Sequence, residues 1–384
     1  MLPARVGVCF GLICSLLATQ ARAEIIAREG QGYLESIQGQ LVLHLKGTHR
    51  EMGYQHGVLL KKQVTSNMNN LIHIKGGQDL VEIGPIKLKP RDAIRFIVGL
   101  QQDYVPAWYN EELAGLAEGS GMPPEEITMA NFIPELFHCS GFAIMNSATA
   151  DGTLYHGRVL DYAIDWGLQE HAVVIIHEPE GKIPFVSVSY AGFIGCVTGM
   201  NERSISIGEM GGGGLGHWHG MPMAVLMREA LQECDTFEKV LDLYRKTPRT
   251  CQYFYVVADG KTNQACGMEA SWDRMDVIYP GESHELLPHA VKDCALLSAG
   301  GRYEELVKRV QEKHGSFTAE DAIRLMDRPV AMSSNLHNVL MEPKTTRFWV
   351  SNAGADKTPA ANRPYYEYNL RELLSQRAEK VAGN

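Results

Sequence analysis

The spacing of apolar and polar positions changes near residue 139. Before it, apolar residues mostly recur at helical intervals, and Thr48-His-Arg-Glu51 has the spacing of a capping box, which predicts a helix beginning at Thr48. Further helices are expected over residues 91–105 and 110–117, and from Pro123 towards residue 137. A short strand-like run, 40–45, precedes them. The first third of the chain is therefore predicted to be mostly helical.

After residue 139 the pattern becomes one of short apolar runs separated by turns such as Asp151-Gly152 and Glu180-Gly181. The runs predict strands of one antiparallel sheet, over residues 141–145, 153–157, 172–177, 184–190 and 204–208. Helices are then expected over 221–234, 236–245, 303–314 and 318–326, with a strand at 253–258 and a late hairpin over 336–351. Strands and helices form separate runs, which favours an α+β fold over alternating βαβ units.

Residues 1–23 have the pattern of a secretory signal peptide. A cationic start at Arg5 is followed by an apolar stretch over residues 6–18 and by the small-residue exit Ala21-Arg22-Ala23. The mature protein is expected to begin at Glu24 and to be periplasmic or secreted. The apolar stretch is short for a membrane span, so no stable membrane insertion is expected, although an uncleaved anchor stays an alternative.

Composition narrows the class of protein. Of the 384 residues, 45% are hydrophobic and 21% charged, which excludes a disordered, collagen-like or coiled-coil chain. The net charge is −9 without a basic stripe, so no nucleic acid is expected as a partner. Six cysteines lie beyond residue 23, widely spaced and without a CxxC pair, and most are interpreted as small buried apolar residues.

Cys139 stands where the helical region ends and a strand begins. If Asp151-Gly152 turns a hairpin, Arg158 and Asp161 at the end of the second strand return to the thiol. An arginine beside a thiol favours the thiolate, and an aspartate can hold an N-terminal amine. A buried cysteine next to an unrelated surface ion pair is the alternative interpretation.

Five co-linear segments carry a resemblance to a known family. They are Cys139-Ser-Gly-Phe-Ala with 148–161, then 47–57, 113–119, Gly199-Met-Asn-Glu202, and 335–343. Together they resemble the acyl-coenzyme A:isopenicillin N (6-aminopenicillanic acid) acyltransferase family of autoproteolytic N-terminal-nucleophile (Ntn) cysteine hydrolases. The chain is more distantly similar to acid ceramidase and bile salt hydrolase.

The resemblance implies a four-layer αββα fold made as a precursor that cuts itself between His138 and Cys139. Residues 24–138 would then form a helical α chain and 139–384 a nucleophile-bearing β chain, both within one folded unit, 24–384. The free α-amine of Cys139 would take the thiol proton, so that no histidine base is needed. By position, Arg158 and Asp161 would line the nucleophile. Val159 stands where the family more often has asparagine.

Acyl transfer also needs hydrogen-bond donors for the oxyanion. The resemblance implies a backbone N–H near residues 210–214, with Gly211 as the candidate, and an asparagine side chain. The segment Leu297-Ser-Ala-Gly-Gly-Arg302 has no asparagine where one is expected. Asn335 and Asn338 are candidate substitutes, although such residues also serve as turn or capping groups.

The leading hypothesis is an exported amidohydrolase that cleaves a small acyl-amide through a thioester on Cys139, without cofactor or metal. An acyltransferase using the same thioester is the first alternative. A zinc hydrolase is the second, because His217-Trp-His219 would place two imidazoles on one face of an extended segment. A noncatalytic binding protein, which would stay uncut, is the third.

Overall fold

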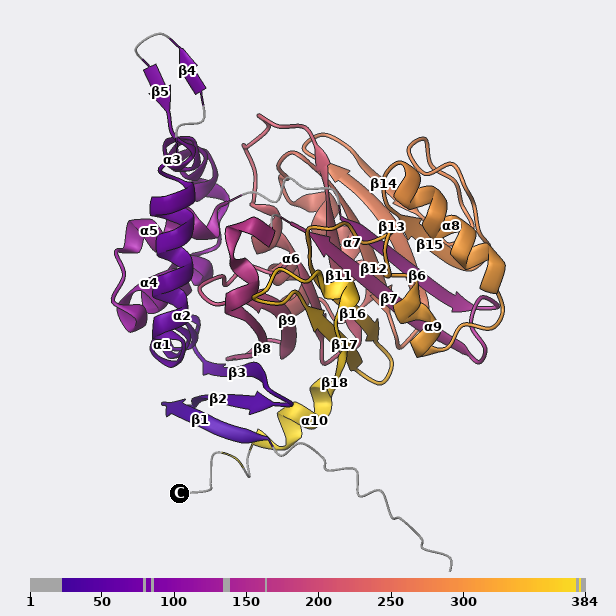
Figure 1. The fold of residues 1–384 in the computed structure, drawn as a ribbon, viewed down its shortest axis with the longest axis horizontal. Coiled ribbons are helices and arrows are strands. Elements are labelled where there is room, and N and C mark those ends of the chain that lie inside the picture. Colours follow the sequence, from indigo (N-terminus) through magenta and orange to yellow (C-terminus); the bar gives the residue numbers. More distant parts are fainter. Residues whose placement is uncertain are drawn as a thin grey trace, which may run out of the picture.

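Two β-sheets form the body of the protein in the computed structural model, which describes residues 23–78, 81–83, 86–133, 139–162, 164–377 and 380 (Figure 1). One sheet has ten strands in the order β1-β2-β3-β8-β9-β10-β11-β12-β13-β14. Their bounds are Glu24–Glu29, Gly32–Ile37, Gln40–Gly47, Ala172–Pro179, Phe185–Tyr190, Thr198–Asn201, Ile205–Gly213, Gln252–Asp259, Gln264–Ser271 and Met275–Ile278. The other has six strands in the order β15-β6-β7-β16-β17-β18, namely Cys294–Leu297, Ser140–Asn146, Gly152–Asp161, Asn335–Glu342, Arg347–Asn352 and Tyr366–Asn369.

The two sheets face each other and helices cover their outer sides. Strands β11, β12 and β13 contact β6, β7 and β15 across the interface. Helices α6 (Met223–Glu233) and α7 (Phe237–Lys246) pack on the ten-stranded sheet, and α8 (Gly301–Lys313) and α9 (Ala319–Arg324) on the six-stranded sheet. The predicted four-layer αββα architecture of an α+β protein is confirmed.

The expectation of one antiparallel sheet was wrong. The hairpin β6-β7 belongs to the six-stranded sheet, whereas β8 to β11 belong to the other. The first third of the chain also contributes three strands, β1 to β3, to the ten-stranded sheet, and β3 pairs in parallel with β8. Short apolar runs show that a strand is buried, but they carry no information on which sheet buries it.

The predicted helices are present with shifted ends. Thr48 caps α1 (His49–Leu59), with both hydrogen bonds of the capping box. The others of the first third are α2 (Lys61–Asn69), α3 (Pro90–Gln101), α4 (Ala107–Ser120) and α5 (Pro124–Asn131), with a π-helical turn at Asn70–Lys75 and the small hairpin β4 (Val81–Ile83) and β5 (Ile86–Leu88). Helix α5 was expected to run from Pro123 towards residue 137; it ends at Asn131, and residues 134–137 lie outside the described range. Helix α10 (Leu370–Ser375) follows β18.

Helices α1 and α4 approach each other through glycines at four-residue spacing. A Cβ added to Gly53 would lie 2.0 Å from the carbonyl oxygen of Glu112, and one added to Gly115 would lie 2.1 Å from that of Arg50. Gly57 and Gly119 meet the opposing backbone in the same way. Two of the segments that carry the family resemblance, 47–57 and 113–119, are therefore packing motifs of the N-terminal helical layer.

A buried ion pair joins that helical layer to α6. Arg228 donates to Glu112 Oε1 at 2.8 Å and to the carbonyl oxygen of Ile194 at 2.6 Å, and both charged side chains are fully buried. The guanidinium carbon also lies 5.0 Å from the centre of the Trp108 ring. The charge is thus compensated by a carboxylate, a carbonyl and an aromatic face.

The described residues include no helix long and apolar enough to cross a membrane. The predicted signal peptide, residues 1–23, lies outside this range except for Ala23, and His138 also lies outside it. The six cysteines beyond residue 23 are all buried, as expected, and none forms a disulfide in the described part of the chain.

The glycine contact between α1 and α4 predicts that Gly115→Ala lowers the free energy of unfolding by about 1–3 kcal/mol, because the added methyl meets backbone that cannot rotate away. Gly99→Ala is the matched control. It lies in α3 with no atom within 4 Å of the added Cβ, and alanine there should raise helix stability by up to about 1 kcal/mol. Urea unfolding of both variants measures the contrast. Equal changes in the free energy of unfolding would show that the close approach of α1 and α4 does not restrict residue 115 to glycine.

Candidate active site

Cys139 lies immediately before β6 and forms part of the wall of a cavity of about 320 Å³. Its side chain is almost fully buried. Most of the other lining side chains are apolar, and they come from both sheets and from the loop before β15: Met210, Phe254, Leu286, Leu287 and Leu297. We call this space the Cys139 cavity.

The predicted hairpin brings the second strand back to Cys139. Ser140 pairs with Val159 and Gly141 with Arg158, so the start of β6 and the end of β7 are adjacent. At the other end of the hairpin, Gly152 has φ +83°, a left-handed conformation that favours glycine, and Asp151 Oδ1 accepts a hydrogen bond from the backbone N–H of Thr153. The turn chemistry read from the sequence therefore sets the register that brings these residues together.

Arg158 points into the space between the two sheets. Its side chain is fully buried, its Nη2 lies 3.4 Å from Glu209 Oε2, and its guanidinium also donates to the carbonyl oxygen of Val159. Gly208 leaves room for it, because a Cβ there would lie 3.2 Å from Arg158 Cδ. Arg158 is thus held by Glu209 of the facing sheet.

Asp161 occupies a different environment, on the side of β7 that faces Arg302. Its Oδ2 accepts a hydrogen bond from Arg302 Nη1 at 2.6 Å, and its Oδ1 accepts one from the backbone N–H of Met332 at 3.0 Å. Burial raises the pKa of the Asp161 carboxyl to about 6, although the Met332 N–H and the Arg302 charge both favour the ionised form. A buried carboxyl whose pKa is shifted towards neutrality is a candidate for a functional site.

Arg302 is the site residue that the sequence did not single out. It lies at the start of α8, and its Nη1 is also 3.3 Å from Ser140 Oγ, which in turn lies 2.7 Å from Ser298 Oγ. Arg302, Ser140 and Asp161 therefore form one polar cluster around the residue that follows Cys139. Residues 297–302 were considered only because an asparagine was expected there. No sequence pattern in this segment marks Arg302 as a site residue.

The glycine run lies on the opposite wall of the Cys139 cavity. Gly211 pairs with Tyr253 and Gly213 with Gln252, which leaves Gly212 as the extra residue of a β-bulge. Gly211 and Gly212 both line the cavity, and a Cβ on Gly212 would lie 2.6 Å from the carbonyl oxygen of Gln252. A bulge releases backbone groups from the ladder, as an oxyanion donor requires.

Asn335 and Asn338 are not among the residues that line the Cys139 cavity. Asn335 pairs with Asp161 in the ladder, and its Nδ2 donates to the carbonyl oxygen of Leu160 and to Asn338 Oδ1. Asn338 Nδ2 donates to the hydroxyl of Tyr365 at 2.9 Å. These contacts indicate that Asn335 and Asn338 stabilise the structure beside Asp161 and are not oxyanion donors.

The other five cysteines differ from Cys139 in their surroundings. Burial raises the pKa of Cys196, Cys234 and Cys294 to about 12 and that of Cys251 to about 11, and it raises the pKa of Cys266 as well. None of the five lines the Cys139 cavity. Their thiols are poor nucleophiles at neutral pH, because the thiolate is the reactive form.

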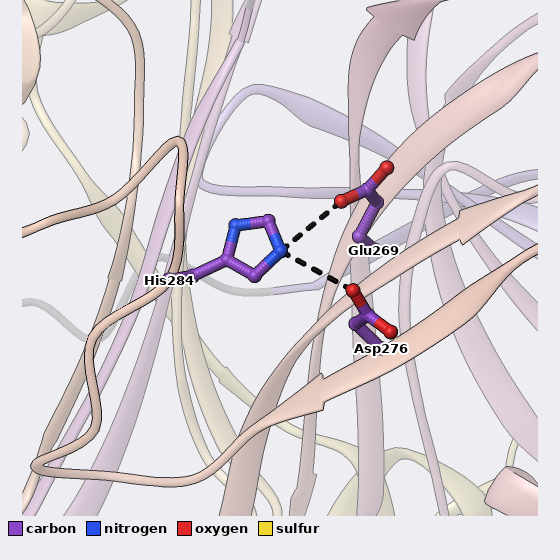
Figure 2. Close-up of side chains that lie close together, drawn as sticks. All are labelled: Glu269, Asp276 and His284. Atoms are coloured by element: carbon purple, nitrogen blue, oxygen red, sulfur yellow. Dashed lines mark ion pairs between the residues drawn. The ribbon is translucent and has the colours of Figure 1, made fainter.

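The residues of the zinc alternative do not converge. His217 stacks on Trp272 with ring centres 3.6 Å apart, and both His217 and His219 are exposed. Within the described ranges, the one group of three side chains that could hold a metal ion is Glu269, Asp276 and His284 (Figure 2). The geometry therefore gives the His217/His219 hypothesis no support.

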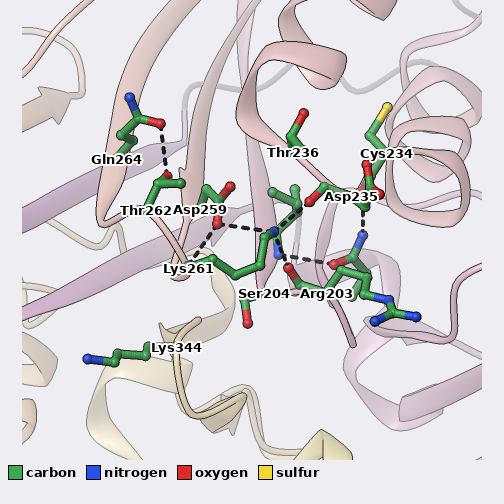
Figure 3. Close-up of polar contacts among 12 residues, drawn as sticks. Arg203, Ser204, Cys234, Asp235, Thr236, Asp259, Lys261, Thr262, Gln264 and Lys344 are labelled. Atoms are coloured by element: carbon green, nitrogen blue, oxygen red, sulfur yellow. Dashed lines mark hydrogen bonds and ion pairs between the residues drawn. The ribbon is translucent and has the colours of Figure 1, made fainter.

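Lys261, just after the end of β12, lies in a cluster of polar contacts (Figure 3). Lys261 Nζ donates to the carbonyl oxygens of Arg203 and Asp235, at 2.6 and 2.5 Å, and lies 3.2 Å from Asp259 Oδ1. The three N–H donors of an ammonium group are matched by these three oxygen partners, so the contacts of Lys261 are those of a structural residue. The cluster ties three chain segments together at the end of the sheet away from Gln252.

Comparisons with known proteins give distant relatives. No family model matches the chain. It is 25% identical over 377 residues to protein dcd1B of Dictyostelium discoideum, covering 87% of this chain and 75% of that protein. It is 26% identical to N-acylethanolamine-hydrolyzing acid amidase of Rattus norvegicus over 191 residues, 46% of this chain and 51% of the relative.

Acid ceramidase of Rattus norvegicus is 24% identical over 187 residues, 42% of this chain and 47% of that enzyme. Among solved structures, a Caenorhabditis elegans ortholog of N-acylethanolamine-hydrolyzing acid amidase aligns with a TM-score of 0.45 and 15% identity, over 54% of this chain and 93% of its own. The matched region spans about half of the named rat hydrolases. The chain is thus similar to amide hydrolases, while the more specific likeness to acyltransferases stays an expectation.

Proposed function

We propose that the protein is an exported Ntn amidohydrolase that cleaves acyl-amides through a thioester on Cys139. The observation that carries the proposal is the position of Cys139. It lies at the start of a strand, on the wall of a cavity, with the buried cluster of Asp161 and Arg302 around the next residue. Similarity to acid ceramidase and to N-acylethanolamine-hydrolyzing acid amidase supports amide hydrolysis.

The reaction begins once cleavage after His138 has freed the α-amine of Cys139. The amine takes the thiol proton, and the thiolate attacks the amide carbon to form a tetrahedral intermediate. The C–N bond then breaks, the leaving nitrogen takes the proton from the ammonium group, and a thioester remains. Water attacks the thioester after losing a proton to the same amine. The C–S bond then breaks, the sulfur takes the proton back from the ammonium group, and the acid product leaves with the thiol restored.

The surrounding residues have separate roles in this scheme. Asp161, held by Arg302 and the Met332 N–H, accepts a hydrogen bond from the α-amine and orients it towards the thiol. Backbone N–H groups at the Gly211-Gly212 bulge stabilise the oxyanion from the facing sheet. Arg158 contributes positive charge on the thiol side of β7 and favours the thiolate.

The cavity indicates the chemical class of the acyl group. Met210, Phe254, Leu286 and Leu297 surround the space next to the thiol. Apolar lining stabilises an apolar acyl chain and offers little to a charged one. We therefore assign a hydrophobic acyl group to the side of the amide that remains on the enzyme.

The mechanism predicts two chains in the mature protein, 24–138 and 139–384, because the amine base exists only after cleavage before Cys139. Cys139→Ala should remain a single chain and hydrolyse no fatty-acyl amide. Cys251→Ala is the control, since that thiol is equally buried but lies outside the cavity. Intact-mass analysis with a fluorogenic acyl-amide assay tests both points. An uncut wild-type chain with full activity would overturn the mechanism.

Asp161→Asn should lower kcat/KM at least ~100-fold, about 2.7 kcal/mol of barrier, because asparagine keeps the volume but loses the charge that holds the amine. Asp165→Asn is the matched control, an exposed carboxylate paired with Lys357 at 2.6 Å. Such a pair contributes only about 0–1 kcal/mol to stability, and its loss should leave activity unchanged. Measurement of kcat/KM on fully processed, folded protein tests this. Equal losses of kcat/KM in both variants would show that Asp161 is not a site residue.

The raised pKa of Asp161 predicts a pH dependence. Below pH 6 the carboxyl is protonated, so log kcat/KM should fall with a break in slope near that value. A break from the α-amine, whose usual pKa is ~7.7–8.0, lies at higher pH. The break near pH 6 should be missing in Asp161→Asn. A profile with the lower break near pH 4, as for an exposed carboxyl, would contradict the role of burial.

A further inference from the structure

Three side chains that do not line the Cys139 cavity converge on one point (Figure 2). Glu269 on β13 and Asp276 on β14 are directly opposite each other in the ladder, and His284 comes from the loop that follows β14. One ligand atom from each lies within 4.8 Å of the other two. We propose that Glu269, Asp276 and His284 form a binding site for a divalent transition-metal ion of the zinc class.

The distances fit a shared cation. His284 Nε2 lies 3.2 Å from Glu269 Oε2 and 3.5 Å from Asp276 Oδ2. In a tetrahedral zinc site with bonds of about 2.0–2.1 Å, neighbouring ligand atoms are about 3.3–3.4 Å apart. Two carboxylate oxygens and one imidazole nitrogen are a donor set suited to zinc, and three protein ligands leave the fourth position for water.

The histidine supplies an independent observation. Its side chain is only 10% exposed, and among the described residues its Nε2 has no partner with the geometry of a hydrogen bond, despite the two nearby carboxylates. The nitrogen forms ion pairs with both carboxylates but a well-aligned hydrogen bond with neither, and a group at the point between them would satisfy this buried nitrogen better. A cation at the centre would satisfy all three side chains.

The remaining contacts of the two carboxylates are compatible with this role. Gln252 Nε2 donates to Glu269 Oε1 at 2.6 Å, which orients the carboxylate and leaves Oε2 facing His284. Asp276 also pairs with Arg274 through Oδ2, the oxygen that faces His284, so a metal ion there displaces Arg274, whose side chain is about half exposed and can turn to solvent. An exposed pair of this kind contributes little and is easily replaced.

The site is joined to the Cys139 cavity on two sides. Gln252 lines that cavity, and so do Leu286 and Leu287, which follow His284 in the same loop. The backbone N–H of Leu286 lies 3.3 Å from His284 Nδ1. A metal ion on Nε2 leaves the ring proton on Nδ1, so this N–H contact is lost and the loop is held by the metal instead. Occupancy would thus change the wall of the substrate cavity.

The test uses calorimetric titration of ZnCl₂ into the chelator-treated, full-length Cys139→Ala protein, so that the reactive thiol cannot be the ligand. We expect one zinc ion per chain and at least ~30-fold weaker binding after His284→Ala. His289→Ala is the matched control on the same loop, an exposed imidazole paired with Glu304 at 2.9 Å, and should bind as the parent does. No hydrolysis is measured, so the outcome is independent of the proposed reaction.

Asp276→Asn provides a second variant, on the partly exposed edge strand, should His284→Ala fail to fold. It should also weaken binding at least ~30-fold, and zinc should protect residues 279–290 of the parent from limited proteolysis. The proposal is overturned if the parent shows no zinc binding at zinc concentrations up to about 100 times the protein concentration. It is equally overturned if the His284 and His289 variants bind alike.

Discussion

The contact between buried Asp161 and half-buried Arg302 is the constraint on which the rest of the candidate site depends. A carboxyl whose pKa is raised to about 6 lowers the stability of the folded state as pH rises from 4 to 6, because the unfolded chain releases the proton more easily. At neutral pH the ionised group therefore costs folding free energy. Stability does not explain such a group, whereas the proposed α-amine of Cys139 would give its charge a partner to position.

The cost is offset by packing elsewhere in the molecule. Helices α1 and α4 meet through four glycines at backbone contact, and the pair of Arg228 and Glu112 connects that layer to α6. Strand β3 adds to the ten-stranded sheet through its parallel pairing with β8. The N-terminal segment is thus part of the same structure as the nucleophile-bearing segment, and it would stay bound after a cut before Cys139.

The sequence predicted the local elements better than their assembly. Capping at Thr48 and the turn at Asp151-Gly152 are encoded by neighbouring residues, so the helix start and the hairpin were both found. The division of strands between two sheets depends on contacts between distant segments, which a single sequence does not display. Arg302 was overlooked for the same reason, since its partner Asp161 is 141 positions away and nothing at residues 297–302 marks the contact.

The division of the site between the sheets has a consequence for maturation. Cys139, Arg158 and Asp161 come from the hairpin β6-β7, whereas Gly211, Gly212 and Glu209 come from β11 of the facing sheet. Under the proposed mechanism, neither sheet alone supplies the nucleophile, the residue that orients its amine and the oxyanion donors together. If self-cleavage uses the same groups as amide hydrolysis, it can proceed only after the sheets have packed. Cleavage would then report a correctly assembled core, and an unfolded or half-folded chain would remain intact and inactive.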